Sequence, residues 1–509
     1  MNLQTYRRKV EGCFLGKTIG GTLGAPLEGK RNAFDVSYYL QDVSQGGIPN
    51  DDLDLQLIWL NAAEKYRDKV DSSILGEYWQ FYIIPNWGEY GAGKNNMRMG
   101  FPPPLSGHVH NIYGESCGAF IRSEIWACLA PGNPDIAVRY AFEDAVVDHF
   151  GEGVYAEVFC AALESAAFVE NDIDTLVDIG LSYLPQNCGI ARAVSCVRDC
   201  LQEQLNWKEA RRRLLFEVPG SFGALCCSPE ERDDTPIGKV GWDAPSNIGL
   251  LVLALLYGEK DFSKTVCLAA ACGEDADCTA ATAGAILGIL LETEKIDDKW
   301  TCPIGRDIKT MCVNACDQGV IIPKTVDELT ERILRLAPFF LGEQCDLLCA
   351  EGGYQIAVKE GRDLFQTPKR VNAWQNWEFS ALLAQSPYVV RYEFPLFTVY
   401  VDYQKDPYIE KDRARAIKLR IENRFYQQQW LTFKLHVPEG TAVQPAPCFS
   451  LPLEQNHCNF GFLETEMAVS LEEMNVGVDS CDCILEISSQ GHHTKGLIPI
   501  KFLLQGENR

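Results

Sequence analysis

The sequence contains no apolar run of about 18 residues, the length that a membrane-spanning helix needs. Basic side chains are scarce, because 46 Lys and Arg stand against 70 Asp and Glu and leave the 509 residues with a formal net charge of −24. Proteins that bind the nucleic-acid backbone neutralise its phosphates with Lys and Arg. The composition therefore argues against a membrane protein and against a nucleic-acid scaffold.

Other familiar signatures are also missing. The first ten residues are not followed by the charge-free apolar run and small-residue cleavage site of a secretory signal peptide. The 21 cysteines include no pair at the C-x2-C spacing of a zinc site. No Gly-x-Gly-x-x-Gly motif supports a dinucleotide-binding fold. We expect reduced thiols and a cytoplasmic location.

Apolar residues recur at helical spacing through most of the first 340 residues. A capping-box pattern at Thr325 and Glu328 opens a helix over 329–336, which Pro338 is expected to end. Strand-like alternation is nearly absent here, so residues 1–340 are predicted to form one large all-α domain. The other clear stripes occupy 10–23, 53–63, 136–147, 155–168, 207–216, 248–257, 265–271 and 279–291.

Beyond residue 385 the apolar period changes to two, which is typical of strands with one buried face. Short alternating segments at this spacing predict a β-sandwich accessory domain over 386–509, joined to the helical domain by a connector over 341–385. The expected fold class is therefore multidomain α plus β. Sugar binding, dimerisation into a homo-oligomer and shielding of the helical domain remain alternative roles for the sandwich. The strand candidates are 397–403, 417–421, 431–437, 467–471, 483–487 and 497–504.

The first predicted helix has a glycine at every fourth position. Four interior glycines cost about 4 kcal/mol in helix propensity, so close packing has to offset the loss. The spacing places them on one face, where another backbone can approach. The helix over 279–291 has a similar face of small residues. The two sets are Gly12, Gly16, Gly20 and Gly24, and Ala280, Gly284 and Gly288.

The direction in which these two faces pack decides where three carboxylates lie. Glu28 follows the first helix, and Asp275 and Asp277 precede the other. Antiparallel packing would bring Glu28 to Asp275 and Asp277, whereas parallel packing would separate them by the length of a helix.

A second acidic segment, Asn50-Asp51-Asp52, opens the helix over 53–63. One aspartate at a helix start is most often an N-cap, but a cap uses only one carboxylate. Two adjacent aspartates here and an Asp-x-Asp at 275–277 repel one another unless they are protonated or bind a cation. Oxygen ligands favour hard ions such as Mg²⁺, Mn²⁺ or Ca²⁺.

Taken together, three segments resemble the ADP-ribosylglycohydrolase superfamily, the group related to dinitrogenase-reductase-activating glycohydrolase. They are the glycine-rich 12–28, Asn-Asp-Asp at 50–52, and Gly-Glu-Asp-Ala-Asp-Cys-Thr with the small-residue helix at 273–288. The resemblance covers residues 1 to about 335 and leaves the β-rich part outside. It implies an all-α, metal-dependent glycohydrolase that cleaves the ribosyl N- or O-glycosidic bond of an ADP-ribosylated protein or an ADP-ribose-like conjugate.

The resemblance also implies roles for individual residues. Two Mg²⁺ ions, or Mn²⁺ in their place, would polarise ribose oxygens and activate water. Asp52 or Glu28 would act as the catalytic base, and the residues alone do not choose between them. The implied substrate-binding residues are Tyr113, Gly114, Ser116, Gly118 and His149, and the implied metal ligands are Asn50, Asp51, Asp52, Asp275, Asp277 and Cys278.

The chain departs from the family pattern at three positions. Asn50 replaces a Thr but keeps an oxygen, Leu53 replaces a Thr without one, and Cys278 replaces a Thr with a soft sulfur ligand. Thr279 is an alternative ligand if the helix start shifts by one residue. A single metal ion is therefore an alternative to two. A non-catalytic ADP-ribose-like ligand-binding protein, a structural protein and a nucleoside or small ribosyl-metabolite hydrolase also stay open.

Residues 86–119 combine polar and aromatic side chains with glycine and a Pro-Pro-Pro run at 102–104. A proline-stiffened loop of this kind suits stacking against a base, and an ordinary capping loop is the alternative.

Overall fold

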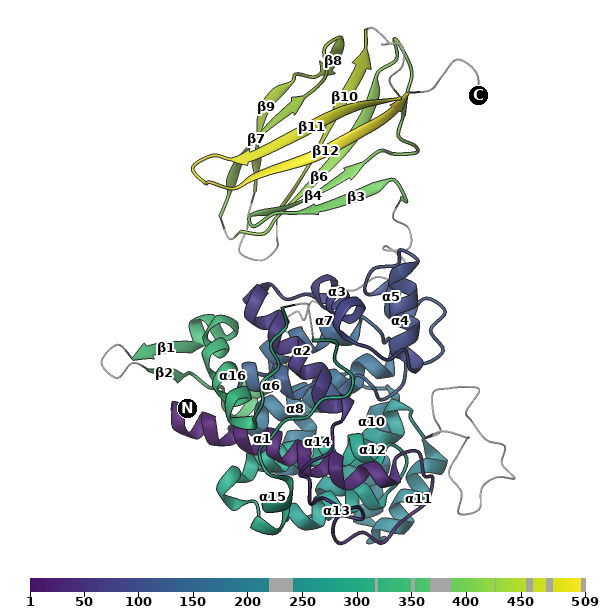
Figure 1. Cartoon of the computed structure of the whole chain (residues 1–509), viewed down its shortest axis with the longest axis vertical. Coiled ribbons are helices and arrows are strands. Elements are labelled where there is room, and N and C mark those ends of the chain that lie inside the picture. The colour runs from purple at the N-terminus through teal and green to yellow at the C-terminus, as the bar shows by residue number, and fades with distance from the viewer. Residues whose placement is uncertain are drawn as a thin grey trace. The chain divides into compact units, whose positions relative to one another are not determined.

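The chain divides into two compact units, Met1–Trp377 and Glu378–Arg509, in the computed structural model (Figure 1). The first unit is helical and the second is built from strands. The expected fold class, multidomain α plus β, is confirmed. The structure describes residues 1–218, 241–315, 319–348, 353–366, 386–425, 427–454, 461–472 and 479–504.

Each predicted helical stripe coincides with a helix of the first unit, and several helices without a clear stripe are added to them. Within the described ranges, no helix is long and apolar enough to cross a membrane. The helices are α1 (Leu3–Gly24), α2 (Asp51–Tyr66), α3 (Ser72–Tyr82), α4 (Gly88–Arg98), α5 (Leu105–His108), α6 (Glu124–Leu129), α7 (Pro134–Ala145), α8 (Glu152–Ala167), α9 (Ile173–Ser182), α10 (Gly189–Gln202), α11 (Trp207–Glu217), α12 (Ala244–Tyr257), α13 (Phe262–Ala271), α14 (Ala276–Leu291), α15 (Asp298–Ile304) and α16 (Val326–Leu341).

The prediction that Pro338 ends the last helix is wrong. Thr325 caps α16 as expected, by accepting a hydrogen bond from the Glu328 amide at 3.2 Å. The helix nevertheless continues through Pro338 and ends where Gly342 takes a φ of 52°. Phe340 and Leu341, in the last turn, are buried in the core. Their burial offsets the cost of the proline in the helix.

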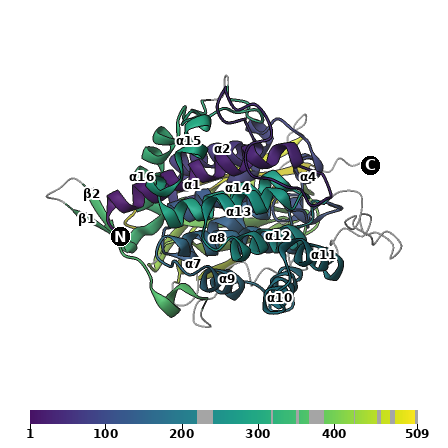
Figure 2. The same cartoon turned by 90° about the horizontal axis from the view of Figure 1, so that it is seen from below.

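The small-residue faces of α1 and α14 pack antiparallel, and Figure 2 shows the two helices side by side. The backbone of α1 lies directly against that of α14 at successive turns. A Cβ added to Gly20 would lie only 1.9 Å from the Ala280 carbonyl oxygen, and one added to Gly16 only 2.0 Å from that of Gly284. The antiparallel alternative is therefore confirmed, and the glycines are required for this close approach.

Gly20→Ala is expected to lower the free energy of unfolding of the helical unit by about 2–3 kcal/mol, because the new methyl group forces two backbones apart. Gly21→Ala is the matched control on the same helix. Its Cβ would find its nearest atom, Asn50 Nδ2, at 3.3 Å, so the change should stay within about 1 kcal/mol. Urea unfolding followed by circular dichroism measures both. Equal losses in the two variants would contradict the packing explanation.

Residues 345–356 of the predicted connector belong to the helical unit. Strands β1 (Cys345–Leu348) and β2 (Gly353–Ile356) pair antiparallel. The Ile356 amide donates to the Met1 carbonyl at 2.9 Å, and the Tyr354 hydroxyl donates to the Leu334 carbonyl at 2.6 Å. Residues 349–352 and 367–385 of the predicted connector lie outside the described residues.

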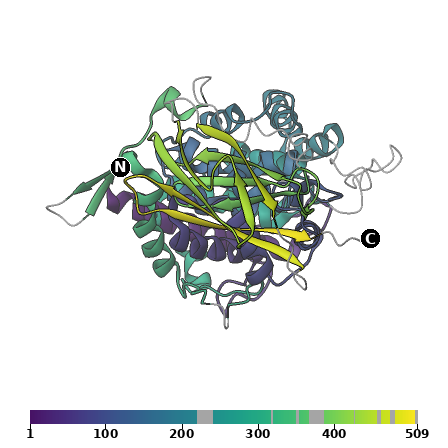
Figure 3. The same cartoon turned by 90° about the horizontal axis from the view of Figure 1, so that it is seen from above.

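The second unit contains two five-stranded sheets, whose strands Figure 3 shows from above. Their orders are β3-β4-β6-β10-β8 and β5-β12-β11-β7-β9. Buried residues of both sheets form one hydrophobic cluster, which includes Val399 and Ile421 of the first sheet and Phe433 and Leu485 of the second. The strands are β3 (Val389–Glu393), β4 (Phe397–Asp402), β5 (Tyr408–Ile409), β6 (Arg415–Asn423), β7 (Gln429–His436), β8 (Thr441–Gln444), β9 (Cys448–Leu453), β10 (Phe462–Leu471), β11 (Ser480–Ser489) and β12 (Lys495–Leu504).

Candidate metal centre

Three chain segments bring carboxylates to one place in the helical unit. Asn50 caps α2 by accepting from the Asp52 amide at 2.8 Å, which places Asp51 and Asp52 in the first turn. Asp275 and Asp277 stand at the start of α14. Glu28 follows the short 3₁₀ helix Ala25–Leu27 that extends α1. The antiparallel contact of α1 with α14 joins the end of one helix to the start of the other.

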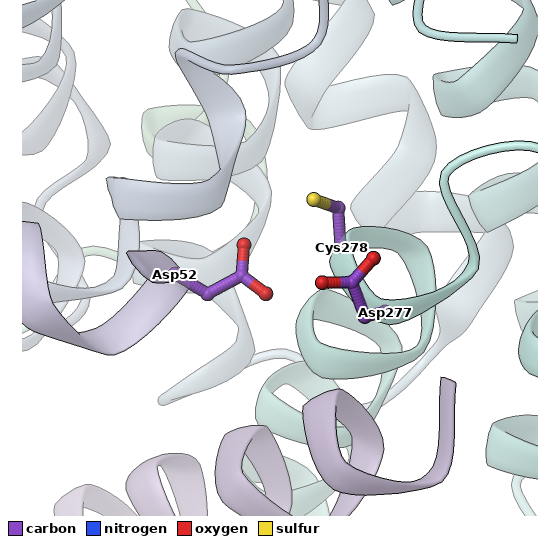
Figure 4. A group of neighbouring side chains, drawn as sticks. All are labelled: Asp52, Asp277 and Cys278. Carbon is purple, nitrogen blue, oxygen red and sulfur yellow. The ribbon is translucent and has the colours of Figure 1, made fainter. Parts of the chain in front are cut away.

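The ligand atoms form two groups that share Asp277. Oxygens of Glu28, Asp275 and Asp277 lie within 4.8 Å of one another. Atoms of Asp52, Asp277 and Cys278 lie within the same mutual limit. In Figure 4 the Asp52 carboxylate points across the gap toward the carboxylate of Asp277 and the sulfur of Cys278.

Three oxygens of these carboxylates have no hydrogen-bond partner within the described residues. Asp52 is 1% exposed and neither of its oxygens has a hydrogen-bond partner there, and Asp277 Oδ1 also has none. Burial raises the pKa of Asp52 and Asp275 well above the usual range, and the charge of Asp277 adds to both shifts. Burial and the charges of Asp277 and Asp51 raise the pKa of Glu28 to about 7. Bound cations would relieve this repulsion, so the donor set fits divalent metal.

Neighbouring donors hold the carboxylates in place. Asn50 Nδ2 donates to Asp277 Oδ2 at 3.0 Å. The Tyr90 hydroxyl donates to Asp51 Oδ2 at 2.8 Å, and the Cys117 thiol donates to Asp275 Oδ2 at 2.6 Å. In this arrangement Asn50 supports the cluster through its amide group, while its oxygen caps the helix. Its role as a metal ligand stays a prediction.

Two of the departures from the family pattern, Leu53 and Cys278, lie beside Asp52. Leu53 is 8% exposed and lines a pocket with Asn50 and Asp52, so an apolar wall stands where an oxygen was expected. The Thr279 hydroxyl, buried, donates to the Asp275 carbonyl of the preceding turn at 2.9 Å. Thr279 is thus engaged by its own helix, and Cys278 is the residue that faces Asp52 and Asp277.

A buried cation lies beside the acidic groups. Lys17 Nζ donates to Glu124 Oε1 at 2.8 Å and to the Ile121 carbonyl at 2.7 Å. Gln56 Nε2 joins Glu124 Oε2 at 2.8 Å to the Asp52 carbonyl at 2.9 Å. The charges of Glu124 and Asp52 raise the pKa of Lys17 although burial lowers it. Lys17 therefore remains charged and offsets part of the negative charge near Asp52.

A second polar chain includes two of the predicted substrate-binding residues. Ser116 Oγ lies 3.0 Å from His149 Nε2, and His149 Nδ1 donates to Asp148 Oδ1 at 2.9 Å. Arg122 Nη2 donates to the same Asp148 oxygen at 2.5 Å. All four side chains are buried. The chain fixes the orientation of the imidazole and of the Ser116 hydroxyl.

Residues 114–118 read Gly-Glu-Ser-Cys-Gly, the G-x-S-x-G spacing of a nucleophilic serine. The surrounding backbone does not complete such a site. The Cys117 amide, which would have to stabilise an oxyanion, donates instead to the Trp242 carbonyl at 2.9 Å. Ser116 is only 3% exposed. We therefore interpret the Ser116–His149–Asp148 chain as a positioning device.

The remaining predicted ligand residues surround this chain. Tyr113 is 40% exposed and packs near Gly88 at the start of α4. A Cβ on Gly114 would meet the ring of Phe150 at 2.2 Å, and one on Gly118 would meet Glu89 Oε1 at 2.0 Å. Both glycines are thus needed for packing.

The expectation of a loop over 86–119 is wrong in part, because residues 88–98 form α4. Two glycines let this helix approach its neighbours closely. A Cβ on Gly93 would lie 2.9 Å from that of Asp148, and one on Gly91 would lie 2.5 Å from the Asn86 carbonyl oxygen. The tertiary contact outweighs the low helix propensity of glycine.

Sequence reasoning missed Lys17, Glu124 and Arg122 as members of the site. The available signal for Lys17 was its place in a glycine-rich helix that was expected to pack closely against another helix. A lysine buried in such a helix needs an acidic partner. Arg122 and Glu124 follow directly after the Ser116 segment, but their partners lie elsewhere in the chain and left no pattern.

Glu164 of α8 is fully buried behind this centre, and burial together with the charge of Glu124 raises its pKa well above the usual range. The native state therefore keeps a proton that the unfolded chain loses above about pH 4.5, so stability from the neutral form is lost as pH rises through the native pKa. Glu164→Gln removes this loss. The difference in free energy of unfolding between Glu164→Gln and wild type should rise, in favour of the variant, by up to about 1.4 kcal/mol for each pH unit above pH 5.

Denaturant unfolding of Glu164→Gln at pH 5, 6, 7 and 8 tests this expectation. Glu343→Gln, at an exposed position, is the matched control and should follow wild type at every pH. A Glu164→Gln curve parallel to wild type would show that Glu164 is ionised in the native protein.

Comparison with known proteins gives a family for the helical unit. The ADP-ribosylglycohydrolase family model matches residues 2–336. A solved ADP-ribosylglycohydrolase-related protein complex is 18% identical, covers 66% of this chain and 98% of its own, with a TM-score of 0.40. No curated protein matches the chain.

Two further solved structures match shorter parts of the chain. A FixG-related protein from Vibrio parahaemolyticus is 9% identical over 22% of this chain and 95% of its own, with a TM-score of 0.17. The cupredoxin domain of amoB from Nitrosocaldus yellowstonii is 11% identical over 24% of this chain and 90% of its own, with a TM-score of 0.16.

Proposed function

Because the chain belongs to the ADP-ribosylglycohydrolase family, we propose that it is a metal-dependent glycohydrolase. Its substrate would be an ADP-ribosylated protein or an ADP-ribose-like conjugate, and the bond cleaved a ribosyl N- or O-glycosidic bond. The proposal rests on two groups of close ligand atoms that share Asp277. One group also contains Glu28 and Asp275, and the other also contains Asp52 and Cys278. Such a junction suits two neighbouring divalent ions, Mg²⁺ or Mn²⁺ in the first instance.

The ions would be held by Asp51, Asp52, Asp275, Asp277 and Cys278. Bound divalent ions polarise ribose oxygens and lower the pKa of water. The carboxylates themselves would supply negative charge near a bound anomeric carbon, where positive charge develops as the glycosidic bond breaks. Tyr90, Asn50 and Cys117 fix the carboxylates by the hydrogen bonds described above, so that little reorganisation is needed.

Exposure separates the two candidates for the base. Glu28 is exposed at the edge of the cluster, whereas Asp52 is 1% exposed and faces Asp277 and Cys278. A base has to reach a water molecule next to the substrate. We therefore assign proton transfer to Glu28 and metal binding to Asp52. Glu28→Gln should lower kcat by about 100-fold or more while metal binding is retained.

Purified full-length protein tests the proposal with ADP-ribosyl-arginine, ADP-ribosyl-serine peptide and small nucleosides, each with Mg²⁺, Mn²⁺ or chelator. Release of a free ribosyl product that depends on metal supports it. Complete stability of all these substrates with either metal would overturn the glycohydrolase assignment for them. Cleavage of nucleosides alone would assign a small ribosyl-metabolite hydrolase.

A protein that binds an ADP-ribose-like ligand without turnover is the second candidate, and Leu53 and Cys278 favour it because both replace expected oxygen donors. Calorimetric binding of ADP-ribose without any hydrolysis would support this alternative. Turnover of any of the tested substrates would exclude it.

A further inference from the structure

We propose that the two ligand groups joined by Asp277 select different ions, and that the group Asp52–Asp277–Cys278 takes a thiophilic divalent ion such as Zn²⁺. The other group, in which Asp275 and Asp277 lie beside the proposed base Glu28, would then take a hard ion such as Mg²⁺. This inference rests on the metal centre of the proposed function and does not require hydrolysis.

The geometry of the first group indicates a ligand-binding site. The sulfur of Cys278 and carboxylate oxygens of Asp52 and Asp277 lie within 4.8 Å of one another, and Figure 4 shows all three side chains pointing into one gap. Zn–S and Zn–O bonds of about 2.3 and 2.0 Å can be formed between atoms this close with small side-chain movements. Three protein ligands leave a fourth position open, as in catalytic zinc sites.

Unpartnered buried oxygens point to a ligand at the same place. Both carboxylate oxygens of Asp52 and Oδ1 of Asp277 are buried, and the described residues offer them no hydrogen-bond partner. Buried polar atoms are normally satisfied, and an ion bound between Asp52 and Asp277 would satisfy this set. Lys17 donates hydrogen bonds to Glu124 and to the Ile121 carbonyl, and it donates none to the Asp52 carboxylate.

The donor chemistry decides which ion each group prefers. Thiolate sulfur binds Zn²⁺ strongly and Mg²⁺ poorly, whereas oxygen-only sets suit Mg²⁺. Cys278 contributes the one sulfur of the first group, and the second group contains carboxylates alone. Neither ligand group includes Cys117, whose thiol donates to Asp275 Oδ2. The two sites share Asp277, and Cys278 is the ligand that makes their ion preferences differ.

Cobalt is a suitable probe, because it replaces zinc and gives a near-ultraviolet sulfur-to-cobalt charge-transfer band only when sulfur is bound. Full-length wild-type protein is titrated with Co²⁺ in excess Mg²⁺. We expect a saturable band, bleached by Zn²⁺ but not by Mg²⁺. Cys278→Ser should lose the band and weaken Zn²⁺ binding about 100-fold, with Mg²⁺ binding changed less than about threefold.

Cys160→Ser is the matched control, since Cys160 of α8 is also buried and belongs to neither ligand group. It should keep the wild-type band. If Cys278→Ser does not fold by circular dichroism, Cys278→Thr provides the same comparison with the family's own residue. A folded wild-type protein that binds Co²⁺ without the band, or a band that persists in the Cys278 variant, would overturn the inference.

The two proposals fail in different ways. A protein that shows the band and loses it in Cys278→Ser, yet cleaves no ribosyl substrate, would overturn the proposed function and leave the mixed-ion site standing. A protein that hydrolyses substrate with Mg²⁺ but never shows the band would overturn the mixed-ion site alone.

Discussion

Asp277→Ala is expected to remove metal binding at both ligand groups and to lower kcat/KM for any cleaved ribosyl substrate by at least about 1,000-fold. Asp277 is the member common to the two groups, so its loss leaves each with only two of its three close ligand atoms. The expected loss in rate corresponds to about 4 kcal/mol of transition-state stabilisation, which is the scale on which a bound divalent ion acts.

Folding should survive this substitution. Asp277 is a source of repulsion in the protein, because its charge raises the pKa of Asp52, Asp275 and Glu28. Removing it should leave the free energy of unfolding unchanged or higher when no metal is present. Wild type should then regain the advantage when Mg²⁺ or Mn²⁺ is added, since ligands that bind only the native state stabilise it.

Asp261→Ala is the control for these experiments. Asp261 caps α13 by accepting from the Lys264 amide at 2.7 Å, so its replacement also removes an aspartate from a helix start. It should cost about 1 kcal/mol of stability and leave metal binding and turnover unchanged. Undiminished turnover in Asp277→Ala would remove Asp277 from the metal assignment.

Local patterns were sufficient for much of the fold. Helical and strand periods depend on which face of an element is buried, so they predicted α1, α14 and the long strands such as β6 and β11. The spacing of Gly12 and Gly284 contained tertiary information as well, because glycine at every fourth residue has a physical purpose only where backbones meet. The junction of Glu28 with Asp277 followed once the helices were antiparallel.

Elements fixed by tertiary contacts gave no such signal. Strands β5 and β8 are short and lie at sheet edges, so their own residues show no run of alternating apolar positions. The α4 helix contains Gly91 and Gly93, which lower its propensity, and it forms because both pack tightly. Lys17 pairs with Glu124, which lies 107 residues further along the chain. Arg122 pairs with Asp144 and Asp148, which lie 22 and 26 residues further along. Only the folded chain brings these partners together.

Arg122 is a buried cation that contacts three buried carboxylates. Its guanidinium donates to Asp144 Oδ1 at 2.8 Å and to both oxygens of Asp148, and Glu157 Oε2 lies 3.8 Å from Nε. Although burial lowers it, the charges of Asp144 and Asp148 raise the pKa of Arg122 well above its usual range. Arg122 and His149 in turn hold the pKa of Asp148 below its usual range, against the effect of burial.

Arg122→Met is therefore expected to lower the free energy of unfolding by about 3–5 kcal/mol, because it leaves buried carboxylates without their cation. Arg198→Met is the matched control, since Arg198 pairs with the exposed Asp174 and Asp178, and it should cost less than about 1 kcal/mol. Urea unfolding at pH 7 measures both. Adding Asp148→Asn to Arg122→Met should recover part of the loss, because one uncompensated charge is removed. Equal effects of the two arginine substitutions would contradict a buried role for Arg122 and, with it, the orientation of His149 through Asp148.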